Sequence, residues 1–256
     1  MSDRPPIKVL LACDLDGTLL TADGSPAPGI VAALAALEAR GARLVVCTGR
    51  PLYSATKAVA VLGADPVAHV CYHGALVVDA TTGEWLRHLT IPAETVGGVV
   101  REARELGLSV TLYHGDARRE LDPAASAGLR ETAALAGITR VVLAGHPDGV
   151  AAALPALTAS LRRTARVEPA GGGTVAVLPA AADKGEGLKL VAARFAVPLA
   201  RVVACGDSAA DESLLRAAAV RIAVGAAPAS LRASAQLFVS QGDLAAALRR
   251  AVTSLG

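Results

Sequence analysis

The sequence predicts an α/β protein built on a doubly wound parallel sheet. Three apolar runs of strand length each stop at residues that can carry chemistry: Lys8–Cys13 before Asp14, Ala42–Cys47 before Thr48, and Arg201–Ala204 before Cys205-Gly206-Asp207. Segments with helical patterns separate these runs. The chain is rich in Ala, Val and Leu and has only 2% aromatic residues, a composition that favours helices packed on a parallel sheet.

Length and charge narrow the class of protein. A chain of 256 residues can bury a full hydrophobic core, as one large domain or a domain with an insert. The net charge of +2 provides no basic surface for nucleic acid, and no apolar run reaches the roughly 18 residues of a membrane span. The four cysteines lack Cys-x-x-Cys spacing and lie near predicted strand ends. We therefore expect a cytoplasmic protein with reduced thiols, and a zinc site formed by the four cysteines is the minor alternative.

The first strand ends in two carboxylates, Asp14 and Asp16, followed by Gly17 and Thr18. Residues i and i+2 of an extended segment share a face, so these two side chains should project into the same space. A divalent cation would relieve their repulsion, and Mg²⁺ often binds one or two carboxylates together with a phosphate. The alternative is a solvated turn, because Asp and Gly are ordinary turn residues.

A second polar strand end follows. Pro28-Gly29-Ile30 begins a predicted helix that reaches about Arg40, and the strand Ala42–Cys47 then ends in Thr48-Gly49-Arg50-Pro51. A hydroxyl, a glycine amide and a proline at the start of a helix are typical of a phosphate cradle. Val67–Tyr72 is a predicted third strand, and the segments around Thr81-Thr82-Gly83 have the pattern of a hairpin.

Residues 90–177 alternate between helix and strand patterns and form a predicted α/β insert. The predicted helices are Pro92–Leu106, Pro123–Ala136 and Asp148–Leu161; the predicted strands are Leu108–Tyr113, Ile138–Leu143, Arg166–Glu168 and Thr174–Leu178. The triple glycine at 171–173 is a predicted turn, because no helix follows it as a dinucleotide loop requires. Tyr113, His114, Arg118 and Arg119 either bind substrate or form an exposed polar loop.

The last third of the chain repeats the pattern of a strand that ends in acids. Asp183-Lys184-Gly185 begins a predicted helix to Phe195, and a lysine at a helix start opposes the helix dipole unless an anion binds there. After the next strand, Asp207 and Asp211 are spaced by four residues. Arg221–Val224 is the last predicted strand, and a helix over Leu244–Val252 ends the fold.

Taken together, these segments resemble the four motifs of the haloacid dehalogenase (HAD) superfamily. Asp14-Leu15-Asp16-Gly17-Thr18 resembles the first motif, Thr48-Gly49-Arg50 the second, Lys184 the third and Gly206-Asp207 with Asp211 the fourth. The layout of residues 90–177 resembles the type-IIB cap of the Cof-like phosphatase branch. The resemblance implies a HAD-like core over 1–89 and 178–256 with an inserted cap over 90–177. Three places depart from that branch: His73 and Ala210 stand where it usually has Asn, and the loop Gly225-Ala226-Ala227 lacks the Asn often found there.

The resemblance also implies roles for individual residues. Asp14 would be the nucleophile that forms an aspartyl-phosphate, and Asp16 the general acid and base. Thr48, the Gly49 amide and Lys184 would bind phosphoryl oxygens. Mg²⁺ would be held by Asp14, the backbone carbonyl of Asp16 and Asp207, with Asp211 in support through water or by orienting Lys184.

The expected function is therefore that of a Mg²⁺-dependent phosphatase acting on a small phosphorylated metabolite, a sugar phosphate. A phosphomutase related to phosphomannomutases is the nearest alternative, and a non-catalytic sensor of a phosphometabolite is the alternative from another class. Partners such as nucleic acid or membrane are not expected, and the chain should be a monomer or a small homo-oligomer. The identity of the substrate lies beyond the sequence, because specificity is expected in the insert, where no motif is found.

Overall fold

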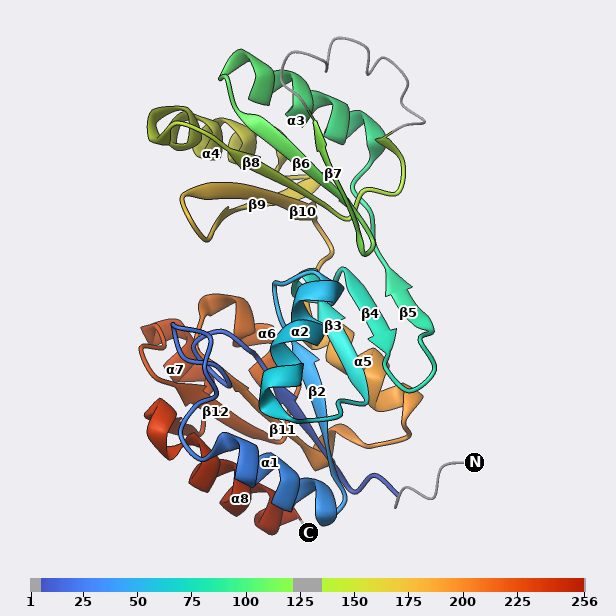
Figure 1. Ribbon diagram of the computed structural model, residues 1–256, viewed down its shortest axis with the longest axis vertical. Coiled ribbons are helices and arrows are strands. Elements are labelled where there is room, and N and C mark those ends of the chain that lie inside the picture. The colour runs from blue at the N-terminus through green and yellow to red at the C-terminus, as the bar shows by residue number, and fades with distance from the viewer. Residues whose placement is uncertain (1–5, 122–134, 256) are drawn as a thin grey trace. The chain divides into compact units, whose positions relative to one another are not determined.

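The computed structural model describes residues 6–121 and 135–255, which form two compact units (Figure 1). The first unit contains the residues up to Arg87 together with those from Asp183 onward, and the second is His88–Ala182. The range 90–177 that the sequence assigns to an insert lies within the second unit. The observed architecture is the predicted α/β fold with a parallel sheet.

One sheet of eight strands forms the centre of the first unit in the described residues. Its order is β13-β12-β11-β1-β2-β3-β4-β5, and neighbouring strands run parallel from β13 to β3, whereas β4 is antiparallel to β3. The strands are β1 Val9–Cys13, β2 Ala42–Cys47, β3 Ala68–Cys71, β4 Leu76–Asp79, β5 Trp85–His88, β11 Val202–Gly206, β12 Val220–Val224 and β13 Leu237–Val239. All five residues of β1 are buried, as expected for a central strand covered on both faces.

Helices cover this sheet and complete its core. They are α1 Ile30–Ala39, α2 Leu52–Leu62, α5 Lys184–Arg194, α6 Glu212–Arg216, α7 Ala229–Ser234 and α8 Leu244–Leu255. Leu10 and Ala12 of β1 belong to one buried cluster with Leu188 of α5 and Leu214 of α6. The α1 and α8 helices pack against each other, and they contact β2 and β11 respectively. The four cysteines, all within the described residues, are buried and carry free thiols.

The position of β1 decides where a site can form. It lies between β2, which follows it in sequence, and β11, which comes nearly two hundred residues later. Chain connections on the two sides of β1 therefore lead in opposite directions, which is the topological switch point of a doubly wound sheet. Loops at the carboxyl ends of strands flanking such a point leave an opening in which ligands bind. Asp14, Thr48 and Asp207 follow β1, β2 and β11 directly.

The second unit has its own sheet and core. The sheet order is β7-β6-β8-β10-β9, with antiparallel neighbours throughout. The elements are α3 Ala93–Glu105, β6 Ser109–His114, β7 Ala117–Leu121, β8 Arg140–Ala144, α4 Pro147–Leu161, β9 Ala165–Ala170 and β10 Thr174–Pro179. Apolar side chains from α3, α4 and the strands form a single buried cluster. The triple glycine at 171–173 connects β9 and β10 as a turn, as predicted.

Three predictions about the elements need correction or lie outside the described residues. The predicted strand Arg221–Val224 is present as β12, but it is not the last strand, because β13 follows it at the edge of the sheet. Arg118 and Arg119 belong to a strand, β7, that pairs with β6, so the segment is not a loop. The predicted helix Pro123–Ala136 falls almost wholly outside the described residues. Among the helices that the structure describes, none combines the length and apolar character needed to cross a membrane.

Candidate active site

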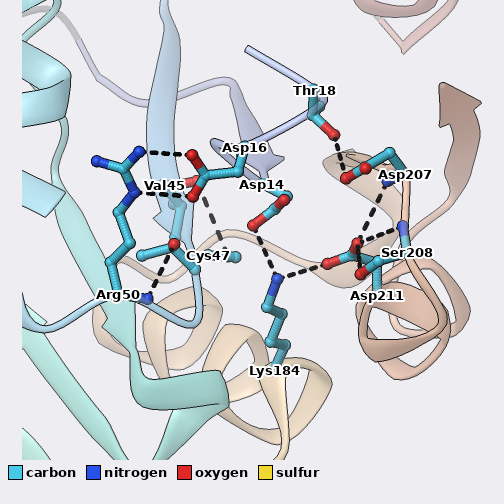
Figure 2. A network of polar contacts seen from close by, with 11 residues as sticks. Asp14, Asp16, Thr18, Val45, Cys47, Arg50, Lys184, Asp207, Ser208 and Asp211 are labelled. Atoms are coloured by element: carbon cyan, nitrogen blue, oxygen red, sulfur yellow. Dashed lines mark hydrogen bonds and ion pairs between the residues drawn. The ribbon is translucent and has the colours of Figure 1, made fainter. Parts of the chain in front are cut away.

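Lys184 is the centre of a buried charge network at the carboxyl end of β1. Its Nζ donates to Oδ1 of Asp14 at 2.9 Å and to Oδ1 of Asp211 at 2.6 Å (Figure 2). The side chains of Lys184, Asp14 and Asp211 are 2%, 8% and 0% exposed. The backbone of Asp14 continues the pairing of β1 with β11, because its N–H donates to the carbonyl of Cys205 at 3.0 Å. The network therefore connects three segments that are far apart in sequence.

Asp211 orients the lysine and also fixes its own loop. Its Oδ2 accepts hydrogen bonds from the hydroxyl of Ser208 at 2.8 Å and the backbone N–H of Ser208 at 3.0 Å. The two residues cap the short 3₁₀ turn 209–211 reciprocally. Ala210, which departs from the branch pattern, lies within this turn, and both acids remain in place around it. Both oxygens of Asp211 thus accept hydrogen bonds from the protein.

Asp207 faces the loop that follows β1. The hydroxyl of Thr18 donates to its Oδ1 at 3.2 Å. Gly17 has φ +76°, and a Cβ at this position would lie 2.2 Å from Oδ2 of Asp207. A side chain at residue 17 would therefore overlap the carboxylate, so glycine is required both for the backbone conformation and for the close approach.

Asp207 lies close to the two carboxylates that contact Lys184. One oxygen from each of Asp14, Asp207 and Asp211 lies within 4.8 Å of the others. Burial raises the pKa of Asp14 to about 8, although the neighbouring Lys184 opposes that shift. Burial also raises the pKa of Asp207, and the charge of Asp211 adds to the effect. Burial alone would lower the pKa of Lys184, but Asp14 and Asp211 together raise it above its usual value.

These residues fit a hard divalent cation. Three carboxylates and one ammonium leave an excess of negative charge, and the donor atoms are all oxygens, the ligands that Mg²⁺ prefers. Burial disfavours the ionised forms of Asp14 and Asp207 and raises their pKa values, and a bound cation would favour the ionised forms. The cluster among the described residues does not include the carboxylate of Asp16.

The side chain of Asp16 instead binds Arg50. Nε of Arg50 donates to Oδ2 of Asp16 at 2.7 Å, and Nη2 donates to Oδ1 at 2.5 Å (Figure 2). This pair is much more accessible than the lysine network, since the side chains of Arg50 and Asp16 are 31% and 56% exposed. The first motif thus places its two acids in different surroundings, one buried against Lys184 and one paired with Arg50.

The predicted phosphate cradle follows β2. The hydroxyl of Thr48 accepts a hydrogen bond from the backbone N–H of Arg50 at 3.1 Å, and Thr48 is buried. His73 packs directly against the cradle, because a Cβ at Gly49 would lie 2.4 Å from its Nε2. Its backbone N–H donates to the carbonyl of Thr48 at 3.0 Å. Only glycine therefore fits at position 49 while the imidazole lies over it.

The turn that carries His73 has an unusual backbone. Tyr72 and His73 have φ values of +49° and +53°, and Tyr72 is completely buried. Two consecutive residues with side chains in the left-handed region are energetically costly, and such strain concentrates at functional sites. A Cβ at the following Gly74 would lie 2.0 Å from the carbonyl oxygen of Asp183, the N-cap of α5. The turn therefore packs between the cradle and the helix that supplies Lys184.

The structure brings most of the predicted residues together. Asp14, Lys184, Asp207 and Asp211 share one cluster, and Thr48 and Gly49 end the neighbouring strand. Neither Arg50 nor Ser208 has a predicted role, although both stand within the motifs. A charged residue next to the polar end of a strand was the available signal for Arg50.

Solved structures share this fold at low sequence identity. A haloacid dehalogenase-like hydrolase from Bacteroides thetaiotaomicron is 21% identical with a TM-score of 0.80, covering 95% of this chain and 99% of that one. The protein TM0651 from Thermotoga maritima is 18% identical with a TM-score of 0.81, covering 95% and 97%. The HAD subclass IIB sugar phosphatase BT4131 is 17% identical with a TM-score of 0.74, covering 97% and 100%. At these identities, the likeness establishes the fold alone.

Sequence comparisons point to the same family. A candidate phosphatase of Streptococcus pyogenes serotype M6, M6_Spy0533, is 35% identical over 77 residues, and the matched stretch spans 29% of this chain and 29% of that protein. The family model described as haloacid dehalogenase-like hydrolase matches residues 11–126 and 129–244, which include every motif described above. The chain therefore belongs to the haloacid dehalogenase-like hydrolase family.

Proposed function

We propose that the protein is a Mg²⁺-dependent phosphatase that hydrolyses a small phosphorylated metabolite, a sugar phosphate, through an aspartyl-phosphate intermediate. The observation that carries this proposal is the contact of Lys184 with Asp14 beside Asp207, at the switch point of the sheet. A carboxylate suited to nucleophilic attack, an ammonium group that could bind phosphoryl oxygens and a set of oxygen ligands suited to a metal lie together there.

In the first step, a carboxylate oxygen of Asp14 attacks phosphorus, and the bond from phosphorus to the substrate's alcohol oxygen breaks. Lys184 fixes the orientation of Asp14 through Oδ1 and also offers positive charge to the transferring group. The hydroxyl of Thr48 and the amide of Gly49 are the proposed donors to phosphoryl oxygens. Asp211 has no direct part in this step, since it holds Lys184 and the loop of Ser208.

Asp16 is the proposed general acid and base. It gives a proton to the departing alcohol oxygen, and it then takes a proton from the water that attacks the phosphorus of the aspartyl-phosphate. This second attack breaks the bond between phosphorus and Asp14, releases inorganic phosphate, frees the carboxylate of Asp14 and leaves Asp16 protonated for the next cycle. The exposed position of Asp16 is consistent with a role towards substrate and water.

The metal would be held by Asp14, Asp207 and the backbone carbonyl of Asp16. Asp211 is less suited to direct ligation, because both of its oxygens accept hydrogen bonds from Lys184 and Ser208. When bound, Mg²⁺ supplies positive charge to the phosphoryl oxygens and favours the ionised form of Asp14.

The proposed substrate class rests on two supports. The subclass IIB sugar phosphatase BT4131 has the same fold, and the net charge of the chain gives no sign of a polyanionic macromolecular substrate.

The test is phosphate release from a panel of sugar phosphates, polyol phosphates and nucleotides, with Mg²⁺ and with EDTA. Asp14→Asn should abolish release while the protein remains folded. Asp148→Asn is the matched control, since its side chain is 94% exposed in the second unit, and it should retain full activity. Release that is independent of metal, or that persists in Asp14→Asn, would refute the mechanism. No release from any substrate would favour a phosphomutase, tested by adding a bisphosphorylated activator, or a non-catalytic sensor.

A further inference from the structure

The pair formed by Arg50 and Asp16 has an arrangement that the proposed function does not yet explain. Two parallel N–H···O contacts, at 2.7 and 2.5 Å, join the guanidinium to both oxygens of the carboxylate. A planar guanidinium that binds a carboxylate in this bidentate manner fixes its direction as well as its position, which a lysine ammonium cannot do. Asp16 is thus held in one orientation (Figure 2).

Arg50 is itself anchored at a defined point of the sheet. Its backbone N–H donates to the hydroxyl of Thr48 at 3.1 Å, and its carbonyl accepts from the N–H of Tyr72 at 3.1 Å. Pro51 follows and restricts the backbone before α2 begins at Leu52. Because β1 and β2 pair as parallel strands, their carboxyl ends lie side by side. The guanidinium of Arg50, which follows β2, can therefore reach Asp16, which follows β1.

Stability is a poor explanation for this contact. Ion pairs between side chains as exposed as these contribute little to folding, because water screens the attraction and two long side chains lose freedom. The carboxylate of Asp16 does not belong to the cluster of acids around Lys184. The contact between Arg50 and Asp16 therefore does not neutralise those buried acids.

We infer that Arg50 is a positioning residue that orients Asp16 for proton transfer to the leaving group. The bidentate contact fixes the ionised side chain; once one oxygen is protonated, the other still accepts from the guanidinium while the proton passes to the leaving oxygen. The inference rests on the proposed function, because it takes Asp16 as the general acid. Arg50 acts through Asp16 in this account and does not contact the reacting atoms. The competing role is direct binding of the substrate's phosphoryl group by the guanidinium, and it makes different predictions.

The experiment compares two substrates that differ in their need for an acid. The leaving group of p-nitrophenyl phosphate departs without a proton, whereas the alkoxide of glycerol phosphate requires one. The value of kcat/KM reports the steps up to departure of the leaving group, so it excludes hydrolysis of the intermediate. Arg50→Gln should lower kcat/KM for glycerol phosphate by about 10- to 100-fold, within the range of general acid catalysis, and for p-nitrophenyl phosphate by less than about threefold.

Two further variants sharpen the test. Arg50→Lys keeps the charge but loses the bidentate geometry, and it should resemble Arg50→Gln on glycerol phosphate. In an Asp16→Asn background, Arg50→Gln should cause no additional loss, because the group through which it acts is absent.

Equal losses on both substrates with raised KM, or full additivity with Asp16→Asn, would overturn the positioning role and assign Arg50 to phosphate binding. Retention of wild-type selectivity in Arg50→Lys would overturn the requirement for bidentate geometry. If the wild type with Mg²⁺ releases phosphate from no alkyl or aryl phosphate of the wider panel, the proposed function is refuted and the role of Arg50 falls with it. Circular dichroism of each variant establishes that losses of activity do not reflect unfolding.

Discussion

The two acids of the first motif, only two residues apart, are held by ion pairs of opposite character. Asp14 contacts a lysine that is 2% exposed, and a second buried acid completes that network. Asp16 contacts an arginine that is 31% exposed, and its own side chain is 56% exposed. Removing one partner of a buried pair leaves an uncompensated charge, whereas an exposed pair can be lost at little cost. Loss of a contact in the buried network should therefore lower the stability of the fold. Loss of the exposed pair should change reactivity without lowering that stability.

The largest expected effect is that of Lys184→Met. The change leaves Asp14 and Asp211 buried without their cation, and it should lower the free energy of unfolding by about 3–5 kcal/mol. Urea denaturation at pH 7 measures this. The matched control is Lys189→Met on the same helix, where the lysine is 50% exposed and pairs with Glu186. The control should change the free energy by less than about 0.5 kcal/mol. Similar losses in both variants would contradict the comparison.

Binding of Mg²⁺ should produce the next largest change. At a concentration about 100 times its dissociation constant, a ligand that binds only the folded protein stabilises it by about 2.7 kcal/mol. Thermal unfolding with Mg²⁺ and with EDTA measures the difference. Asp207→Asn removes a carboxylate of the cluster and should abolish most of this gain, whereas Asp148→Asn should keep it. A gain that persists in Asp207→Asn would place the cation elsewhere.

A third ion pair, between Asp79 and Arg194, is intermediate. Asp79 is 1% exposed and Arg194 is 38% exposed, and Nε donates to Oδ2 at 2.8 Å. Burial would raise the pKa of Asp79, but hydrogen bonds from Thr81 and Arg194 outweigh it and lower the pKa. Asp79→Asn should therefore lower the free energy of unfolding by about 1–2 kcal/mol at pH 7. This is the lower part of the range for hydrogen bonds to a charged group, because Arg194 is partly exposed.

The pH dependence of this effect follows from the direction of the shift. A carboxyl with a lowered pKa contributes stability above its unfolded pKa of about 4, and the contribution disappears as pH falls through the folded value. Urea denaturation of the wild type and Asp79→Asn should thus show a difference in stability that shrinks as the pH falls below about 4. A constant difference across this range would mean that the lost contribution is steric and does not depend on the charge of Asp79.

The smallest effect on folding is expected for Arg50→Gln. Since both partners are exposed, the free energy of unfolding should change by less than about 1 kcal/mol, as urea denaturation would measure. The variant would then separate reactivity from stability, in contrast to Lys184→Met. A loss comparable to that of the lysine variant would show that the pair supports the fold.

The sequence predicted the strand ends of the core well because each apolar run stops sharply at a polar residue. Asp14, Thr48 and Asp207 lie where the periodicity of the runs put them. The sequence could not predict β7, since Ala117–Leu121 is mostly charged and becomes a strand only by pairing with β6. The edge strand β13 has three residues, too few for a periodic signal.

The site was harder to predict than the fold in one respect. The spacing of Asp14 and Asp16 places both at one strand end, but it contains no information on which cation each side chain contacts. That choice depends on Lys184, at the start of α5, and on Arg50, in the segment between β2 and α2. The left-handed backbone of Tyr72 and His73 was equally inaccessible, because neither residue type favours it.

The central position of β1 also bears on the order in which the chain folds. Its partner β11 is synthesised only after the whole second unit, and the contact between Thr18 and Asp207 joins residues 189 positions apart. Until residues 202–206 emerge from the ribosome, one edge of an entirely apolar strand has no partner. Such late, long-range pairing slows folding and exposes the nascent chain to aggregation. A chain that stalls before β11 would therefore lack part of the proposed metal site and also expose the unpaired edge of an entirely apolar strand.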